Sequence, residues 1–255
     1  MSSLGRYLEF SVYTPNILDS LSFYKLLGFE ELEIGEVWSH KYAVITDGVL
    51  CIGLHDQHFE GPSITFVQQD LAKRVRTMTD HGFDFSVVQL DEDVFNELGL
   101  DDRDGHRITM LEARTFSGGD EHGNDSVCGT WFELSLPTRD AVRGARFWAS
   151  VAPAMLEFRE EPTTHMRFDA GGAAVGLSES IALEAPALCF RCSDKDALFV
   201  LLERHGFTYK KFPGYEGAFV AVTAPEGTRL FVFDQDFLGE SYEVEESDEP
   251  AAYLE

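Results

Sequence analysis

Basic residues are scarce in this chain of 255 residues. It has 20 Lys and Arg against 45 Asp and Glu, which gives a net charge of −25. Nucleic acids and anionic membrane surfaces both repel a chain of this charge. The composition therefore argues against nucleic acid and membranes as partners.

Long apolar runs are also missing from the sequence. No stretch approaches the roughly 18 apolar residues that a membrane helix needs. The N-terminal residues are polar and lack the apolar run behind a basic segment that marks a secretory signal. Hydrophobic residues still make up 44% of the chain, enough for substantial cores. We therefore expect a globular cytoplasmic protein.

The four cysteines show no spacing typical of a metal site. Cys189 and Cys192 form a C-x-x-C pattern, but they lie in an alternating run that predicts a strand. A redox C-x-x-C normally starts a helix, and a zinc site needs further ligands. We interpret these cysteines as buried thiols.

A strand followed by a helix opens the chain over residues 7–28. The first residues alternate, which places Tyr7, Glu9 and Ser11 on one face of the expected strand. Asn16 can cap the following helix, and Gly28 suits the left-handed position that ends it. This strand and helix are the first elements of a larger pattern.

The same pattern returns after an offset of 124 residues. Glu9 recurs as Glu133 and Ser11 as Ser135, and the run His81-Gly82-Phe83 recurs at 205–207 in the same register. Such a constant offset indicates an internal duplication. We predict one domain over 1–115, a linker over 116–126, a second domain over 127–235 and an acidic tail over 236–255.

Each half reads as two modules of one strand, one helix and three further strands. Helices are expected after residue 70, over 140–151 and over 194–205, with a helical turn around Phe95. Asp47-Gly48 and Gly171-Gly172 are hairpin turn signals. The predicted fold class is α+β, with four βαβββ modules in two duplicated domains.

Four such modules resemble the vicinal oxygen chelate superfamily, which includes glyoxalase I, bleomycin-resistance proteins and extradiol dioxygenases. The resemblance covers about residues 5–235, and its most specific marks are Phe23-Tyr24-x-x-Leu-Gly28-Phe29 and the segment 102–108. It implies that each pair of modules curls its sheet into an open cup that binds a small molecule. In enzymes of the family a divalent metal, usually held by His, Gln or Glu, lies in the cup.

The resemblance also says where metal ligands would lie: in the first and last strands of each module. These positions are Glu9, Gly53, Ser63 and Thr109 in the first half and Glu133, Gly176, Ala187 and Phe231 in the second. An open catalytic metal site needs about three protein donors, and each half has a single carboxylate there. We therefore expect no family-type metal and no other cofactor. A site built instead from His40, His55 or His106 stays open.

A concave site with aromatic walls and few polar groups suits a small organic ligand. No catalytic residue is assigned. The expected ligand-binding residues are Tyr7, Glu9, Ser11, His55, Thr109 and Leu111 in the first cup and Trp131, Glu133, Ser135 and Phe231 in the second.

Two of these side chains have alternative roles. Glu9 is either a strand carboxylate bonded to a neighbour such as Ser11, or a ligand-orienting acceptor or general base. His55 either points into the cup near its rim or is a solvated surface residue.

Three classes of function follow. The first, which we favour, is a glyoxalase-like or bleomycin-resistance-like protein that binds a small organic ligand without the family metal. The second is an enzyme: a metal-dependent lyase, isomerase or dioxygenase with ligands elsewhere, or a metal-free catalyst. The third is a non-catalytic scaffold with vestigial cups. Homodimer formation is left open.

Overall fold

A computed structural model describes residues 3–33, 40–91, 96–112, 126–152, 154–160, 163–212 and 218–237. The described residues form sixteen strands and four helices. The predicted helical turn around Phe95, most of the predicted linker and the tail from residue 238 onward lie outside the described residues.

The first half contains eight strands and two helices. They are β1 (Arg6–Tyr13), α1 (Ile17–Leu26), β2 (Glu30–Leu32), β3 (Tyr42–Thr46), β4 (Cys51–His55), β5 (Ser63–Gln68), α2 (Leu71–Asp80), β6 (Val87–Gln89), β7 (Glu97–Asp101) and β8 (Arg107–Glu112).

The second half repeats this series. It comprises β9 (Thr130–Pro137), α3 (Ala141–Val151), β10 (Ala154–Arg159), β11 (His165–Asp169), β12 (Ala174–Ser178), β13 (Ala187–Cys192), α4 (Lys195–His205), β14 (Tyr209–Lys211), β15 (Phe219–Thr223) and β16 (Arg229–Asp234).

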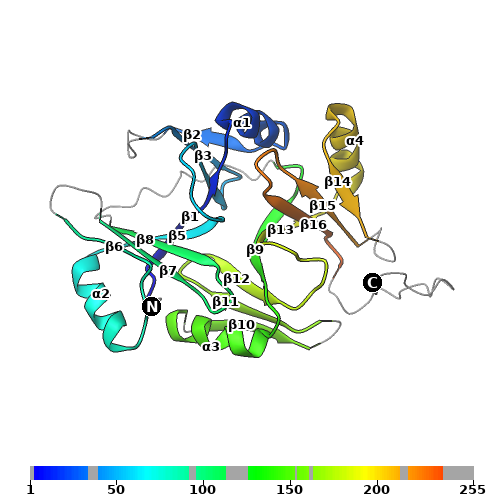
Figure 1. Cartoon of the computed structure of the whole chain (residues 1–255). Helices are drawn as coiled ribbons and strands as arrows, with labels where there is room; N and C mark the ends of the chain where they lie inside the picture. Colours follow the sequence, from blue (N-terminus) through cyan, green and yellow to red (C-terminus); the bar gives the residue numbers. More distant parts are fainter. Residues whose placement is uncertain are drawn as a thin grey trace, which may run out of the picture.

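Each half builds one eight-stranded mixed sheet, and the two sheets have the same strand order. The order is β2-β3-β4-β1-β5-β8-β7-β6 in the first and β10-β11-β12-β9-β13-β16-β15-β14 in the second. The helices lie on the outer faces of the sheets (Figure 1). The predicted α+β fold of four βαβββ modules is confirmed.

Helix starts follow from local capping. The side chain of Asn16 accepts a hydrogen bond from the backbone N–H of Leu18, and Asp140 accepts one from Arg143. These bonds satisfy donors that the first turn of a helix leaves open. Gly28, after α1, has the positive φ of 91° that the sequence predicts.

A β-bulge changes the face of one residue in each first strand. In β1, Tyr7 lies opposite Phe66 while Glu9 lies opposite Thr65, so two steps along β1 match one step along β5. Such an extra residue reverses the alternation beyond it. Tyr7 therefore lies on the outer face with Phe10, and a matching bulge in the β9–β13 pair does the same to Trp131.

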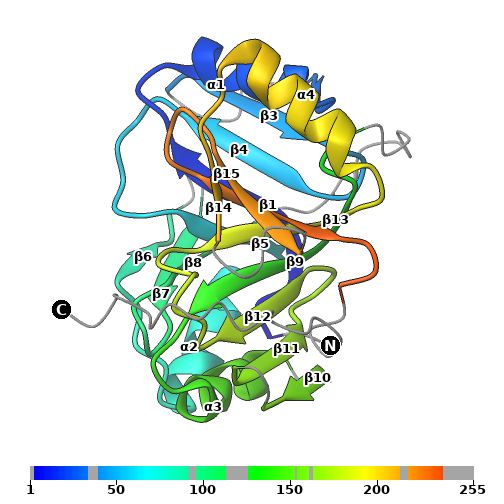
Figure 2. The same ribbon diagram turned by 90° about the vertical axis from the view of Figure 1, so that its right-hand side faces the viewer.

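Equivalent residues meet each other where the halves pack together. The rings of Tyr7 and Trp131 stack with centroids 5.9 Å apart. The ring centroids of Phe23 and Phe207 are 4.8 Å apart. Those of the equivalent pair, Phe83 and Phe147, are 5.9 Å apart. This reciprocity is that of a two-fold axis. Helix α1 accordingly lies near α4, and α2 near α3 (Figure 2).

Two hairpin turns fasten the halves through carboxylate acceptors. In the turn between β15 and β16, Glu226 accepts hydrogen bonds from Ser20 Oγ and Tyr24 Oη of α1, both at 2.7 Å. In the turn between β7 and β8, Asp102 accepts from Trp148 Nε1 of α3 at 3.1 Å. Trp148 takes the place of Tyr24, so each half clasps the helix of the other.

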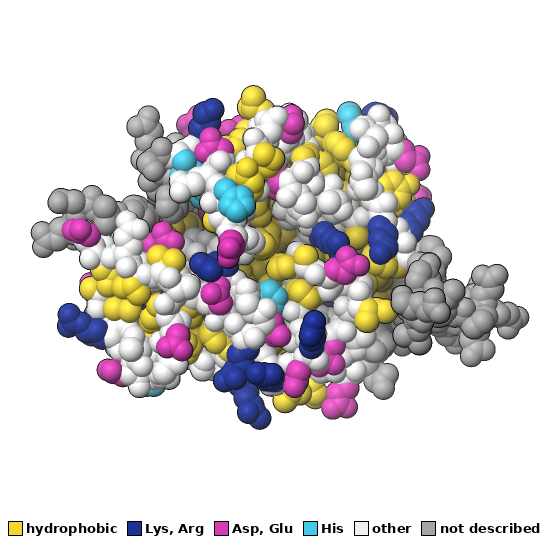
Figure 3. Space-filling view, viewed as in Figure 1, with side chains coloured by type: hydrophobic (Ala, Val, Ile, Leu, Met, Phe, Trp, Pro, Cys, Tyr) yellow, Lys and Arg dark blue, Asp and Glu magenta, His cyan; other side chains and the backbone are white. Residues whose placement is uncertain are grey.

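The surface is consistent with the acidic composition. On the face shown in Figure 3, acidic and basic side chains are interspersed rather than gathered by sign. Within the described ranges, no helix has the length and apolar character needed to cross a membrane.

Asp102 provides a test of the clasp between the halves. Burial raises its pKa, but hydrogen bonds from His106 and Trp148 outweigh that effect and leave the pKa below its ordinary value. A lowered carboxyl pKa stabilises the fold above the unfolded-state pKa, and that contribution is lost as the pH falls through the folded-state pKa.

We therefore expect Asp102→Asn to lower the free energy of unfolding by about 1–3 kcal/mol at pH 7. The difference from the unmodified protein should shrink as the pH falls below about 4. Urea unfolding followed by tryptophan fluorescence measures both. Asp84→Asn, at an exposed neighbouring carboxylate, is the control. Equal stability of the Asp102 variant and the unmodified protein at pH 7 would contradict the clasp.

Candidate functional site

The first cup is the concave face of the sheet formed by β1 to β8. Strand register sets which side chains share it: Glu9 lies opposite Thr65, which pairs with Thr109, and Ser11 lies between Gly53 and Ser63. Cross-strand partners point to the same face of a sheet. Glu9, Ser11, Thr109 and, two residues on, Leu111 therefore lie in this cup, as the sequence predicts.

Glu9 is almost fully enclosed, with 2% of its surface exposed. Its Oε1 accepts a hydrogen bond from Ser11 Oγ at 2.7 Å and contacts His55 Nε2 at 3.3 Å, and its Oε2 accepts from the hydroxyl of Tyr42. A buried carboxylate needs such donors because burial otherwise removes its hydration. The expected bond to Ser11 is present, and Tyr42 is a donor that sequence reasoning missed.

A glycine makes room for this carboxylate. Gly53 of β4 lies directly against it, and a β-carbon at that position would overlap the carboxyl atoms of Glu9. Gly176 stands in the same relation to Glu133. Two of the eight positions that the family resemblance marks for metal ligands thus have no side chain here, and the Glu carboxylate takes the space.

His55 extends the network outward. Only 5% of it is exposed, so the alternative of a solvated surface residue is wrong. Its Nδ1 lies 2.9 Å from Nε2 of His40. Burial and the neighbouring charge of His55 lower the pKa of His40. Glu9, His55 and His40 therefore form a linear chain of polar contacts from the floor of the cup toward its rim.

Hydroxyl groups line the rest of the floor. Ser11 Oγ and Thr65 Oγ1 are 2.7 Å apart, and Ser63 Oγ and Thr109 Oγ1 are also 2.7 Å apart. A hydroxyl both donates and accepts, so each pair can rotate its protons toward a ligand.

Glu97 is a second carboxyl group of the first cup that the sequence did not reveal. Register places it opposite Leu111 and on the same face as Thr109. Burial raises its pKa, and the charges of Arg107 and His55 offset part of the rise. A carboxyl with a perturbed pKa in a concave face is a frequent feature of functional sites.

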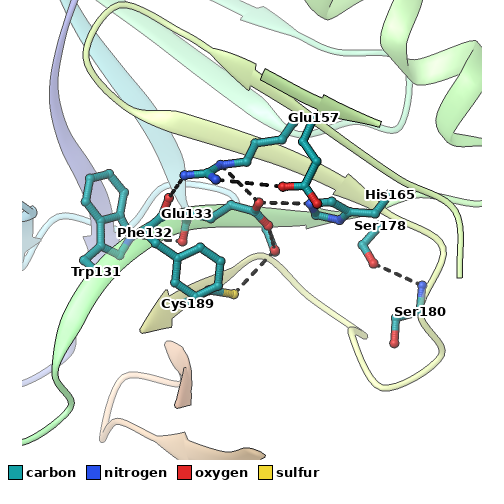
Figure 4. A network of polar contacts seen from close by, with 10 residues as sticks. Trp131, Phe132, Glu133, Glu157, His165, Ser178, Ser180 and Cys189 are labelled. Carbon is teal, nitrogen blue, oxygen red and sulfur yellow. Dashed lines mark hydrogen bonds and ion pairs between the residues drawn. The ribbon is translucent and has the colours of Figure 1, made fainter. Parts of the chain in front are cut away.

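The second cup has the same plan around Glu133, which is 2% exposed. Glu133 accepts a hydrogen bond from Ser135 and lies 3.0 Å from His165 Nε2 and 3.6 Å from Arg167 Nε (Figure 4). In the second half His165 lies opposite Ser178, and in the first half Tyr42 lies opposite His55. His165 is therefore the equivalent of Tyr42. The predicted place of Glu133 and Ser135 in this cup is confirmed by the register.

Aromatic rings occupy much of the second cup. Phe231, predicted as its apolar floor, is buried beside Cys189 and Ala221. Ring centroids 4.8 to 6.3 Å apart connect Phe212, Phe219, Phe231, Phe233 and Phe237. The first cup has Thr109 where this cup has Phe231.

The placement of Tyr7 and Trp131 in the cups is wrong. Strict alternation predicts Tyr7 beside Glu9 and Trp131 beside Glu133. The bulges instead turn both aromatic side chains to the outer face. Phe132 lies instead on the concave side, where the guanidinium groups of Arg167 and Arg191 lie over its ring. A bulge depends on pairing between distant strands, so the sequence of β9 alone carries no signal for it.

The cysteines behave as the sequence predicts. Cys189 and Cys192 lie in β13, and all four cysteines are free thiols. Burial raises the pKa of Cys189, and it raises that of Cys128 to about 12. Such thiols are poor nucleophiles near neutral pH because little thiolate forms.

The donor set does not fit a divalent metal of the kind that the family resemblance implies. At the family positions each cup has one carboxylate, already bonded to protein donors, and the other family positions are glycine, alanine, phenylalanine or paired hydroxyls. His55 contacts Glu9 and His40 through opposite edges of its ring, so the three do not converge on one point. Across the described ranges, no three His, Cys, Asp or Glu side chains are grouped to hold a metal.

His106, the other histidine considered as a ligand, lies away from the cups. Its Nδ1 is 2.9 Å from Asp102, in the clasp between the halves.

Comparison with known proteins identifies the fold. No family model matches the sequence, and no curated protein matches it either. Among solved structures, a catechol 2,3-dioxygenase is 12% identical, with a TM-score of 0.59, over 90% of this chain and 87% of that one. The 2,3-dioxygenase LapB from Pseudomonas sp. KL28 is 12% identical, with a TM-score of 0.60, over 90% and 91%.

A mutant homoprotocatechuate 2,3-dioxygenase from Brevibacterium fuscum is 13% identical, with a TM-score of 0.58, over 92% of this chain and 73% of that one. These extradiol dioxygenases are members of the vicinal oxygen chelate superfamily. The chain therefore has the vicinal oxygen chelate fold that its repeated modules predict.

The contact between Gly53 and Glu9 gives a double-mutant test. Gly53→Ala should displace the carboxylate and lower the free energy of unfolding by about 1–3 kcal/mol. In a Glu9→Ala background the added methyl group has space. The loss of unfolding free energy caused by Gly53→Ala should therefore be smaller there than in the unmodified protein, by more than about 0.5 kcal/mol. Gly53→Ala combined with Glu133→Ala, at the equivalent site of the other half, is the control. Additive losses for Gly53 and Glu9 would refute the contact.

Glu97 predicts a pH effect of known sign. Its raised pKa means that the folded protein favours the protonated form, which stabilises the fold below the ordinary carboxyl pKa and is lost as the pH rises through the folded-state pKa. Glu97→Gln should therefore raise the melting temperature at pH 8, with little change near pH 4. Glu60→Gln, at an exposed site, is the control. A variant that is less stable at pH 8 would show that Glu97 is held as a carboxylate.

Proposed function

We propose that this protein binds a small hydroxylated organic molecule in its first cup, without a metal at the family positions. The observation that carries the proposal is the buried carboxylate of Glu9 beside a floor of hydroxyl pairs. Few polar groups, held rigidly by neighbouring strands, are what orients a small ligand in a concave site. Glu9 is then the polar anchor.

Two differences between the cups favour the first. Packed phenylalanine rings take up space in the second cup, whereas the first has Thr109 at the matching position. Arg167 also lies beside Glu133, while Glu9 has only neutral hydroxyl donors and a histidine. The charge of Glu9 is therefore less compensated and more available to a ligand hydroxyl.

Phenols are the ligand class that suits this site best. A phenol hydroxyl can donate to Glu9 or to a floor hydroxyl and can accept from another. Aromatic rings lie on one side of Glu9. The ring centroids of Tyr42 and His55 are 4.5 Å apart, and those of Phe59 and His55 are 5.6 Å apart. The similar folds carry names of catechol-cleaving dioxygenases, which makes catechol a reasonable first probe.

The proposal is of binding rather than ring cleavage. Extradiol-type chemistry uses a metal held by two histidines and one carboxylate with open positions. The residues at the family positions lack these donors, so the proposal assigns no reaction step to a metal. Sequestration of a small molecule needs the cup and its polar anchor alone.

Calorimetric titration with catechol tests this function, with its dimethyl ether, which cannot donate a hydrogen bond, as the matched control ligand. Glu9→Gln should weaken catechol binding at least tenfold, which is about 1.4 kcal/mol. It should change the free energy of unfolding by less than about 1.5 kcal/mol. Glu133→Gln, the same change in the second cup, should leave binding unchanged.

Three results would contradict the proposal. One is equal affinity of the unmodified protein for catechol and its dimethyl ether. Another is binding that survives Glu9→Gln but not Glu133→Gln, which would move the site to the second cup. The third is stoichiometric Fe, Mn, Ni or Zn, found by mass spectrometry after purification without a chelator or metal-affinity tag and lost in a Glu9→Ala or Glu133→Ala variant.

A further inference from the structure

A cavity of about 650 Å³ lies along the seam where α2 and α3 approach each other. It is separate from both cups, because helices cover the outer faces of the sheets and the cups are their concave faces. The turn between β7 and β8 forms one side of it. A space of this size holds a small organic molecule.

Three arginines from three different elements line this cavity: Arg74 of α2, Arg103 of the turn and Arg146 of α3. In the part of the chain that the structure describes, neither Arg103 nor Arg146 forms an ion pair. The side-chain amide of Gln68 lies against Arg74, and its oxygen accepts from Arg74 Nε at 2.9 Å when the amide is turned with its oxygen toward the guanidinium group. An amide carries no charge, so the positive charge of Arg74 is not neutralised by this bond.

The acidic residues at the cavity are engaged elsewhere or lie at its edge. Asp101 accepts a hydrogen bond from Arg107 Nε at 2.6 Å. Asp102 faces His106 and Trp148 in the clasp between the halves. Asp84 is exposed. Asp101 and Asp102 therefore have partners other than the three arginines, and the exposed Asp84 is the described lining carboxylate left to offset the arginine charge.

The second seam of the molecule shows that the fold does not need these arginines. Packing of α1 against α4 is equivalent to that of α3 against α2, with the same pair of phenylalanines at its centre. In that seam Leu198, Pro225 and Ser22 occupy the positions of Arg74, Arg103 and Arg146, respectively. The same packing thus forms without a single arginine at these places.

Apolar side chains also line the cavity, together with the polar Ser3, Thr77, His81 and Ser150. The apolar ones are Met78, Phe83, Leu100 and Phe147, and the two phenylalanine rings meet nearly edge to face. Guanidinium groups bind carboxylates and phosphates through paired hydrogen bonds, and apolar walls favour a ligand with a hydrocarbon or aromatic part. Both requirements are met by one class of molecule.

We propose that this cavity binds a small organic anion, a phosphate monoester or a carboxylate attached to an apolar group. Arg103 and Arg146 hold the anionic group from opposite sides of the seam, and Phe83 and Phe147 contact the apolar part. A ligand here bridges α2 and α3, so it also strengthens the contact between the two halves of the protein.

Phenyl phosphate and benzoate are suitable probes, with phenol as the neutral control. Calorimetric titration of the full chain at constant ionic strength should detect binding of at least one of the two anions. The Arg103→Ala/Arg146→Ala double variant should weaken it at least thirtyfold. Arg139→Ala/Arg143→Ala removes two exposed arginines outside the cavity and causes the same change in net charge. That control should stay within twofold of the unmodified protein.

The two anions distinguish the ligand types. Binding of phenyl phosphate alone assigns the site to phosphate monoesters, and binding of benzoate alone assigns it to carboxylates. Phenol binding as tightly as either anion, or equal losses in the two double variants, overturns the proposal. So does a lack of anion binding at about 10 millimolar probe.

A second measurement covers the case in which the double variant fails to fold. Phenylglyoxal modifies exposed arginines. The protein without substitutions is treated with this reagent, and mass spectrometry locates the arginines that react. The bound anion should slow modification of Arg103 and Arg146 at least fivefold and leave Arg139 and Arg143 unaffected. Equal protection of all four arginines would refute the site. The Glu9→Gln variant should show the same pattern of arginine protection, because Glu9 lies in the cup and not in this cavity.

Discussion

A carboxylate enclosed by each sheet is the constraint around which this molecule is arranged. An isolated buried charge is costly, so the surrounding strands must supply donors and space. Ser11, Tyr42 and His55 supply the donors for Glu9, and the missing side chain of Gly53 supplies the space. Because these residues come from three strands, the carboxylate also ties the register of those strands together.

The two halves meet this constraint in the same way but have diverged around it. The second uses His165 and Arg167 where the first has Tyr42 and a valine, and it fills much of its concave face with phenylalanine. A hydroxyl-lined cup and an aromatic cup from one duplicated plan offer different chemistry to ligands. This divergence is the physical basis for assigning the proposed ligand to the first cup.

Packing between the halves is equally reciprocal, and it has diverged as well. Tyr7 stacks on its own counterpart, Trp131, and each hairpin turn places an acidic acceptor against a helix of the other half. One seam between helices has no arginine at the three matching positions, whereas the other carries three arginines around a cavity. The site proposed there exists only because the halves associate, since its walls come from both.

The sequence by itself determined the duplication, the four modules, the helix starts at capping residues and the place of Glu9 and Glu133 in the cups. These features follow from local periodicity, turn chemistry and a constant offset. Tertiary structure alone decided the rest. Pairing between distant strands introduced the bulges that turned Tyr7 and Trp131 outward, brought Tyr42 to Glu9 and put Glu97 on the same face of the sheet as His55. No local rule predicts these contacts, because each depends on residues that meet only when the sheet closes.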